Sequence, residues 1–365
     1  MTKKILITGG CGFVGSHLIE HILKNTDWHI TTLDRFDAAG NPNRLADVLE
    51  DTPGLDRSRV KFVFWDLKAE LNEQVRAQLG GPFDYIAHLA AGSHVDRSID
   101  LPLLFFMDNT IGTVNLLNYA KTGGLANEYY LEGEEMKSRL TGKFLYFSTD
   151  EVFGPAPLDM VGGYKEWDRP NPNNPYAAAK SAAEMAVISY ANTYRIPCVI
   201  TNTMNIYGER QSPEKYVPLV INKILKGEKL MIHANKDKTQ AGMRFYLHAR
   251  NICAATIWVL ENGVCLDGTA TQGRYNVVGE KEMDNLTLAQ LIHKFVHEYE
   301  NEHGRECKDL DYELVDFHSS RPGHDLRYSL DGSHLKEAGF SFPNSFDASL
   351  RKMIFWTLDR KDKWL

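Results

Sequence analysis

Short apolar runs rich in β-branched residues recur through the first 200 positions, and they alternate with longer segments whose apolar residues have helical spacing. The short runs predict buried strands at residues 4–8, 28–33, 60–65, 85–91, 143–148 and 198–203. The longer segments predict helices at residues 16–23, 109–119 and 176–194. Strands and helices that alternate in this order predict an α/β fold, a Rossmann-like doubly wound parallel sheet.

The pattern changes near residue 208, where polar loops and aromatic strand-like runs replace the regular alternation. We expect a smaller, mixed C-terminal lobe over residues 208–365, following a first domain over residues 1–207. Short returns to the first domain are expected at roughly residues 244–260. Residues 122–142 are rich in Gly and Glu and are interpreted as a surface excursion.

A glycine-rich turn follows the first strand directly. Gly9, Gly12 and Gly15 have the spacing of a tight turn, a close approach to a pyrophosphate and tight helix packing. The next strand ends in Asp34, where a carboxylate accepts hydrogen bonds from ribose hydroxyls and repels a 2′-phosphate. The turn and Asp34 therefore predict a dinucleotide site that favours NAD over NADP. The alternative is that Asp34 only opens a turn.

The strand at residues 143–148 runs into Thr149, Asp150 and Glu151, at the edge where open α/β sheets bind ligands. Tyr176 and Lys180 share one face of a helix, so that an ammonium group could stabilise a phenolate and lower the pKa of the tyrosine. This combination predicts acid–base chemistry. The alternative is that Asp150 and Glu151 form an exposed turn.

The start of the same helix has its own signal. Asn174 stands before Pro175, and asparagine at the N-cap with proline at the first helical position is typical of a helix start. The helix is therefore expected to begin immediately before Tyr176.

Composition narrows the function classes. The 365 residues are 43% hydrophobic and 24% charged, with a net charge of −7, which argues against a broad nucleic-acid surface. We find no run long enough to span a membrane, and the apolar run before Gly9 is shorter than expected of a secretory leader. The five cysteines have no metal-ligand spacing and are expected to be reduced thiols in a cytoplasmic protein.

With these residues in view, the chain resembles the extended short-chain dehydrogenase/reductases, and specifically the NDP-glucose (dTDP-glucose) 4,6-dehydratase family. The motifs that carry the resemblance lie at residues 37–41, 88–98, 109–113, 148–154, 205–208 and 321–325. The most specific is Thr-Asp-Glu at 149–151. In the same superfamily, the 4-epimerases lack both carboxylates, and the UDP-glucuronate decarboxylases keep only a residue like Glu151.

The resemblance implies a hydro-lyase that retains NAD and converts a nucleotide-diphosphate sugar to its 4-keto-6-deoxy form. Tyr176 would take the C4 hydroxyl proton, with Thr149 bonded to the same oxygen. Glu151 would remove the C5 proton, and Asp150 would protonate the departing C6 hydroxyl. The enzyme would be a homodimer joined through the two long helices. The alternatives are an NDP-sugar epimerase, a decarboxylase, or a non-catalytic NAD-binding sensor.

The resemblance also assigns binding residues. Those for the cofactor are Gly9, Gly12, Phe13, Val14, Gly15, Asp34, Asp66, Leu67, Leu89, Ala90, Ala91, Asn109, Tyr176 and Lys180. Those for the nucleotide sugar are Ser93, His94, Asp96, Asn205, Lys215, Arg244, Asn276, Arg321 and His324. Asp66 also follows a strand directly and is a candidate for the adenine edge. For His94, a purely structural hydrogen-bonding role is the alternative.

The chain departs from the family pattern at three places. Gly92 stands where the dTDP-glucose enzymes have glutamate, and residues 235–242 form a longer loop. In addition, Arg-Phe-Tyr-Leu-His-Ala-Arg-Asn at 244–251 replaces an acidic-aromatic run. The nucleotide base and the C2 substituent of the sugar therefore stay open, with UDP-glucose and N-acetylated sugars as alternatives to dTDP-glucose.

Overall fold

The computed structural model describes residues 2–37, 39–132, 135–269, 271–316 and 326–365. The chain forms two compact units. Unit 1 consists of Met1–Val152, Glu166–Asn202 and Cys253–Asn276, and unit 2 of Phe153–Lys165, Thr203–Ile252 and Val277–Leu365.

This division differs in detail from the expected one at residue 207. Unit 2 also takes in residues 153–165, and the later return to unit 1 covers residues 253–276 rather than 244–260. The reason is strand pairing. The strand at residues 243–248 pairs with its neighbours in unit 2, whereas the strand at residues 274–277 joins the large sheet.

Unit 1 is built on a seven-stranded sheet with the strand order β12-β8-β7-β4-β1-β2-β3. Its strands are β1 (Lys4–Thr8), β2 (His29–Asp34), β3 (Val60–Phe64), β4 (Tyr85–His88), β7 (Lys143–Thr149), β8 (Cys198–Thr203) and β12 (Arg274–Val277). The pairs from β7 to β3 are parallel. Thr8 is the register partner of both Leu33 and His88, so the residues that follow these three strands meet at one edge.

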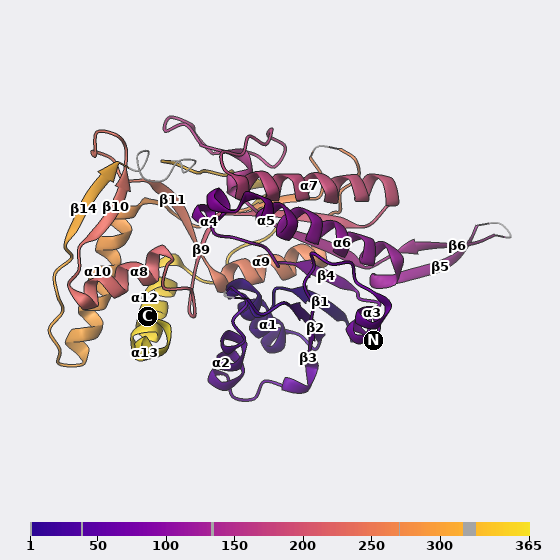
Figure 1. Cartoon of the computed structure of the whole chain (residues 1–365), viewed down its shortest axis with the longest axis horizontal. Helices are drawn as coiled ribbons and strands as arrows, with labels where there is room; N and C mark the ends of the chain where they lie inside the picture. Colours follow the sequence, from indigo (N-terminus) through magenta and orange to yellow (C-terminus); the bar gives the residue numbers. More distant parts are fainter. Residues whose placement is uncertain (1, 38, 133–134, 270, 317–325) are drawn as a thin grey trace. The chain divides into compact units, whose positions relative to one another are not determined.

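Helices cover both faces of this sheet (Figure 1). The helical elements that lie wholly or mainly in unit 1 are α1 (Phe13–Asn25), α2 (Asn43–Asp51), η1 (Arg57–Arg59), α3 (Glu73–Leu79), α4 (Val95–Asp100), α5 (Pro102–Phe106), η2 (Met107–Ile111), α6 (Gly112–Tyr119), η3 (Ala120–Gly124), η4 (Asp150–Phe153), α7 (Pro175–Tyr194) and α9 (Ala249–Asn262). α1 packs against α2 on one face, and α6 packs against α7 on the other. A continuous apolar core fills the space between the sheet and α3, α6 and α7.

The structure adds detail to two sequence expectations for unit 1. The helix expected at residues 109–119 is present as the π-helical turn η2 followed by α6, and it ends in η3, where Thr122 and Gly123 have non-helical dihedral angles. The excursion at residues 122–142 contains an antiparallel hairpin of β5 (Asn127–Glu132) and β6 (Glu135–Leu140), which projects away from the sheet (Figure 1). Cross-strand pairing can order such a segment in spite of its polar composition.

Unit 2 contains two small sheets, ordered β13-β11-β9 and β10-β14. Its elements are β9 (Asn205–Tyr207), α8 (Tyr216–Lys226), β10 (Leu230–Ala234), β11 (Met243–His248), β13 (Glu282–Asp284), α10 (Asn285–Glu302), β14 (Tyr312–Asp316), α11 (Ser333–Glu337), α12 (Phe346–Asp359) and α13 (Lys361–Trp364). α10 packs against α8 and α12 around a second apolar core.

A buried polar cluster ties the sheet of unit 1 to α7. Glu184 of α7 is fully buried, and its Oε2 accepts a hydrogen bond from Nη2 of Arg274 on β12 at 2.7 Å. Its Oε1 accepts from Nδ2 of Asn202 on β8, also at 2.7 Å. The same Nδ2 donates to the carbonyl oxygen of Thr149 at 3.2 Å. One carboxylate therefore joins three elements and reaches the end of β7.

We expect Glu184→Gln to destabilise the protein strongly, since it leaves Arg274 buried without a countercharge. Breaking a buried ion pair from one side typically costs about 3–5 kcal/mol. Urea denaturation measures the change in the free energy of unfolding. Glu298→Gln breaks the ion pair with Arg351 on the surface of unit 2 and is the matched control. Its expected cost is small, because solvent screens an exposed ion pair. Equal losses in the two variants would contradict this account.

Candidate active site

The glycine turn after β1 has the geometry that its spacing predicts. Gly9 has φ +76°, and a Cβ atom there would lie 2.9 Å from the backbone of Ala90. A Cβ atom on Gly15 would lie 2.1 Å from the carbonyl oxygen of Gly9. Gly12 is the N-cap residue of α1 and has no side chain to cover the first turn of the helix. The turn is therefore a cradle that larger residues would fill, and α1 begins at it with the positive end of its dipole.

Asp34 ends β2 beside this cradle. It is 7% exposed, and its carboxylate accepts hydrogen bonds from the backbone N–H groups of Cys11 and Phe36, both at 3.0 Å. Burial raises the pKa of Asp34, while the two N–H groups oppose the shift. A Cβ atom on Gly40 would lie 2.4 Å from Oδ1 of Asp34, so Gly40 leaves the space beside the carboxylate open.

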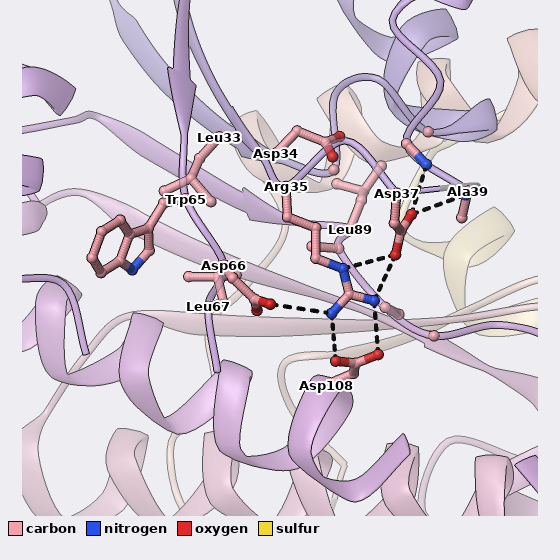
Figure 2. A pocket seen from close by; sticks show the side chains of 16 residues that line it. Leu33, Asp34, Arg35, Asp37, Ala39, Trp65, Asp66, Leu67, Leu89 and Asp108 are labelled. Carbon is pink, nitrogen blue, oxygen red and sulfur yellow. Dashed lines mark hydrogen bonds and ion pairs between the residues drawn. The ribbon is translucent and has the colours of Figure 1, made fainter. Parts of the chain in front are cut away.

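A pocket opens at this edge of the sheet (Figure 2). The residues predicted to bind cofactor that line it are Gly9, Gly12, Asp34, Asp66, Leu67, Leu89, Ala90 and Ala91. The other residues that line it are Leu33, Arg35, Asp37, Ala39, Gly40, Trp65, Gly92 and Asp108. The glycine cradle and the buried carboxylate fit the pyrophosphate and the ribose of a dinucleotide.

The second group of residues includes charges that sequence reasoning missed. Arg35 donates to both carboxylate oxygens of Asp108 and to Asp37. These bonds raise the pKa of Arg35, with the Asp108 hydrogen bond as the largest cause. Asp108 precedes Asn109 in a helix 73 positions further on, so no local pattern indicates the pairing. In the sequence, Arg35 could have been identified as part of the cofactor site because it immediately follows Asp34.

Asn109 lies next to the pocket rather than among the residues that line it. It is 1% exposed, and its Oδ1 accepts from the backbone N–H of Gly92 at 2.7 Å. Its Nδ2 donates to the carbonyl oxygen of the same residue at 3.1 Å. Asn109 therefore fixes the loop that follows β4. The remaining predicted cofactor residues, Phe13, Val14 and Gly15, belong to the first turn of α1.

The loop after β4 also holds three residues that were predicted to bind the sugar. His94 is the N-cap of α4, and its Nδ1 accepts from the N–H of Arg97 at 3.4 Å, a long bond. This contact matches the structural alternative for His94. Ser93 is exposed, and Asp96 lies in the first turn of α4. Their role in binding stays a prediction.

The five predicted catalytic residues lie on three elements, Thr149 at the end of β7, Asp150 and Glu151 in η4, and Tyr176 and Lys180 in α7. Thr149 ends β7, and its Oγ1 donates to Oδ1 of Asp150 at 3.0 Å. Thr149 also forms a hydrogen bond with Tyr176 of α7. The backbone N–H of Glu151 points to Oγ1 of Thr149 at 3.4 Å. Thr149, Asp150, Tyr176 and Lys180 are all at most 8% exposed. The cluster is a buried site and not an exposed turn.

Asn174 connects the start of α7 to this cluster. Its Oδ1 accepts from the N–H of Ala177 at 2.8 Å, which confirms the predicted N-cap. Its Nδ2 donates to Oε2 of Glu151 at 2.9 Å. One side chain therefore starts the helix that carries Tyr176 and also orients the carboxylate of Glu151.

The amine of Lys180 donates to the backbone in this structure rather than to the phenol of Tyr176. Its Nζ donates to the carbonyl oxygen of Phe147 at 2.7 Å and lies 4.2 Å from the ring centroid of Tyr146. Burial raises the pKa of Tyr176, the charges of Glu151 and Asp150 raise it further, and only the bond with Thr149 lowers it. Helical spacing brings residues i and i+4 to one face but does not decide where a long amine points.

The other predicted sugar-binding residues are dispersed. Asn276 is fully buried in β12 of unit 1. In unit 2, Asn205 is exposed on β9, and Lys215 is the N-cap residue of α8. Arg244 donates to the carbonyls of Met243 and Leu326 and stacks on Tyr328. Arg321 and His324 lie outside the described residues.

The unusual run at residues 244–251 has a structural explanation within unit 2. Nη1 of Arg250 donates to Oε1 of the buried Glu209 at 2.8 Å, and Nε2 of His248 lies 3.2 Å from Oε2 of the same residue. Arg250 therefore has its countercharge on Glu209, shortly after β9.

The fold and these contacts define a class: a dinucleotide-binding enzyme with a Tyr–Lys pair at the end of a Rossmann-like sheet. A family model described as GDP-mannose 4,6 dehydratase matches residues 6–353. The chain belongs to this family, a dehydratase branch of the extended short-chain dehydrogenase/reductases.

Curated relatives match nearly the whole chain. A dTDP-glucose 4,6-dehydratase from Neisseria gonorrhoeae is 34% identical over 99% of this chain and 97% of its own length. A dTDP-glucose 4,6-dehydratase from Escherichia coli is 32% identical over 99% of this chain and 95% of its own length.

Solved structures match as well. The dTDP-glucose 4,6-dehydratase from Streptomyces venezuelae, with NAD and TYD bound, has a TM-score of 0.77 at 29% identity and covers 99% of this chain and 98% of its own. That from Bacillus anthracis, in complex with NAD, has a TM-score of 0.75 at 26% identity, with 100% and 99% covered. NAD is the cofactor of this chain. The glycine cradle after β1 and the carboxylate of Asp34 fit its pyrophosphate and its ribose.

In the part of the chain that the structure describes, no helix is long and apolar enough to cross a membrane. Within the same residues, no group of three or more His, Cys, Asp or Glu side chains is placed to hold a metal ion.

Because burial lowers the pKa of Lys180 to about 7, from 10.5, the folded protein loses this proton before the unfolded chain does. Between these values the unfolded state binds more protons, so this residue makes the free energy of unfolding rise with pH above about 7. We expect wild type to gain about 2 kcal/mol relative to Lys180→Met between pH 7 and 9. Urea denaturation measures the gain, with Lys61→Met, at an exposed position of β3, as the control. A pH-independent difference would contradict the expectation.

Proposed function

We propose that this protein is an NAD-dependent NDP-hexose 4,6-dehydratase that acts on dTDP-glucose. The observation that carries the proposal is the cluster of Thr149, Asp150 and Glu151 at the end of β7, buried against Tyr176. The curated relatives named for dTDP-glucose, which match almost end to end, support this choice of nucleotide sugar.

The reaction removes water across C5 and C6 of the hexose, and it needs an acidic C5 proton, which a ketone at C4 supplies. Bound NAD⁺ supplies the hydride acceptor that makes this ketone and later returns the hydride to C6. Tyr176 takes the proton of the C4 hydroxyl, and the Thr149 hydroxyl, which donates to Asp150 in the structure, turns to donate to the same oxygen. Glu151 removes the C5 proton, and Asp150 protonates the C6 hydroxyl as it leaves.

The two carboxyl groups have the different surroundings that these roles need. Asp150 is 6% exposed and accepts a hydrogen bond from the Thr149 hydroxyl. Glu151 is more exposed and accepts from the amide of Asn174. Burial favours the neutral form of a carboxyl group, which the general acid Asp150 requires, and the greater exposure of Glu151 favours the ionised form, which a general base requires. When two neighbouring carboxyl groups have different environments, one can act as the general acid and the other as the general base.

The test combines product mass with proton exchange in deuterated water. Wild type should convert dTDP-glucose to a product that has lost water. Asp150→Asn should still exchange the C5 proton but release little dehydrated product. Glu151→Gln should neither exchange the C5 proton nor release dehydrated product, but it should keep its bound NAD. The loss of each general acid or base should slow turnover by about 10²–10⁴-fold.

Glu298→Gln, on the surface of unit 2, is the matched control and should leave turnover unchanged. A product of unchanged mass would indicate epimerisation, and loss of carbon dioxide would indicate decarboxylation. Binding without turnover would indicate a sensor. Full dehydration by Glu151→Gln would remove the proposed base. A panel of UDP- and N-acetylated sugars tests the nucleotide and the C2 substituent.

The proposal includes a homodimer. Leu103, 73% exposed on α5, begins a row of exposed apolar side chains that continues through Phe106, Met107 and Ile111, and Met185 is exposed on α7. Contiguous apolar surface of this kind marks an interface, and two helices can pack against the same pair of a second copy. The five thiols, all free in the structure, support the expectation of a cytoplasmic setting.

We expect Leu103→Glu to shift the protein from dimer to monomer, because a charge at the centre of an apolar interface must be desolvated. Light scattering after size-exclusion chromatography measures the mass. Val161, 96% exposed in unit 2, provides the matched control Val161→Glu, which should stay dimeric. A monomeric wild type would refute the dimer.

A further inference from the structure

The residue after Asp34 is an arginine whose guanidinium is bound by two carboxylates (Figure 2). Nη1 of Arg35 lies 2.5 Å from Oδ1 of Asp108, and Nη2 lies 2.9 Å from Oδ2, so that the pair is bidentate. Nε and Nη2 of Arg35 also lie 2.7 and 2.6 Å from Oδ2 of Asp37. Bidentate pairing of this kind fixes the plane of the guanidinium as well as its position.

Two further charges complete the network. Asp66 lies 3.7 Å from Nη1 of Arg35 and 3.3 Å from Nζ of Lys68. The same lysine lies 3.8 Å from Asp108, whose side chain is only 6% exposed. With Asp34, the group has four acidic and two basic side chains, a formal net charge of 4 × (−1) + 2 × (+1) = −2.

This arrangement bears on the choice between NAD and NADP. In dinucleotide-binding folds, an acidic residue at the end of the second strand bonds the ribose hydroxyls, whereas a nearby arginine accommodates a 2′-phosphate. This chain has both residue types side by side, as Asp34 and Arg35. Asp34 alone therefore leaves the preference undecided, and the partners of Arg35 decide whether it can serve a phosphate.

We propose that Asp37 and Asp108 determine the specificity for NAD by holding Arg35 away from the 2′ position. A 2′-phosphate would have to displace two carboxylates from the guanidinium and would enter a pocket that is already negative. The ribose hydroxyls of NAD need only the Asp34 carboxylate, which backbone N–H groups hold in place independently of Arg35. The inference concerns the cofactor and does not depend on the sugar substrate.

The test measures displacement of bound NAD from the full-length holoenzyme by added NADP, with the released NAD quantified by chromatography. For Asp37→Asn combined with Asp108→Asn, we expect NADP to bind about ten- to hundredfold more tightly than to wild type, because the freed arginine gains charge-assisted hydrogen bonds. Affinity for NAD should change less than about fivefold.

Adding Arg35→Met to the double variant separates two explanations. If freed Arg35 binds the phosphate, the triple variant loses the gain. If the triple variant keeps it, the loss of negative charge alone is responsible and the proposal is overturned, as it is if the double variant shows no gain. Should the double variant fail to fold, Asp37→Asn alone, at a side chain 39% exposed, is expected to show part of the gain, and no gain there overturns the proposal. Glu298→Gln controls for the loss of a surface ion pair.

Discussion

The site depends on one buried amide, that of Asn202. Its Nδ2 donates both to the carbonyl oxygen of Thr149 and to the carboxylate of Glu184. These bonds attach the end of β7, where the catalytic side chains lie, to the helix that carries Tyr176. Hydrogen bonds to a buried charge are among the stronger ones in proteins, and their loss leaves polar groups without compensation. These buried hydrogen bonds therefore hold the catalytic residues of β7 and α7 in position relative to one another.

Cofactor binding and acid–base chemistry lie at different positions along one edge of the sheet. The β1–β2 side provides a glycine cradle and the charged pocket around Arg35, which suit a dinucleotide. The β7 side provides a compact group of a hydroxyl, two carboxyls and a phenol. Parallel strands bring both to one edge because all their carboxyl ends point the same way. This arrangement suits a reaction in which one cofactor both removes and returns a hydride, since cofactor and acid–base groups must act on neighbouring atoms.

Sequence periodicity predicted most of the sheet, and its expected strand at residues 198–203 coincides with β8. It missed the hairpin at 127–140 and the π-helical turns around α6. Polar composition conceals cross-strand pairing, and a π turn changes the hydrogen-bond register without changing apolar spacing. The predicted effect of Lys180 on the pKa of Tyr176 stays a prediction, and in the structure the amine of Lys180 donates to the carbonyl oxygen of Phe147.

The sequence by itself determined the local structural features of the site: the glycine turn, Asp34 at the end of β2, the Asn174 cap and the Thr-Asp-Glu run. Each depends on backbone conformation or on residues a few positions apart, which periodicity and residue type encode. The tertiary structure alone decided the pairing of Arg35 with Asp108 and the contacts of Glu184 with Asn202 and Arg274. These contacts join residues 18 to 90 positions apart, and only the order of strands in the sheet and the packing of helices on it bring them together.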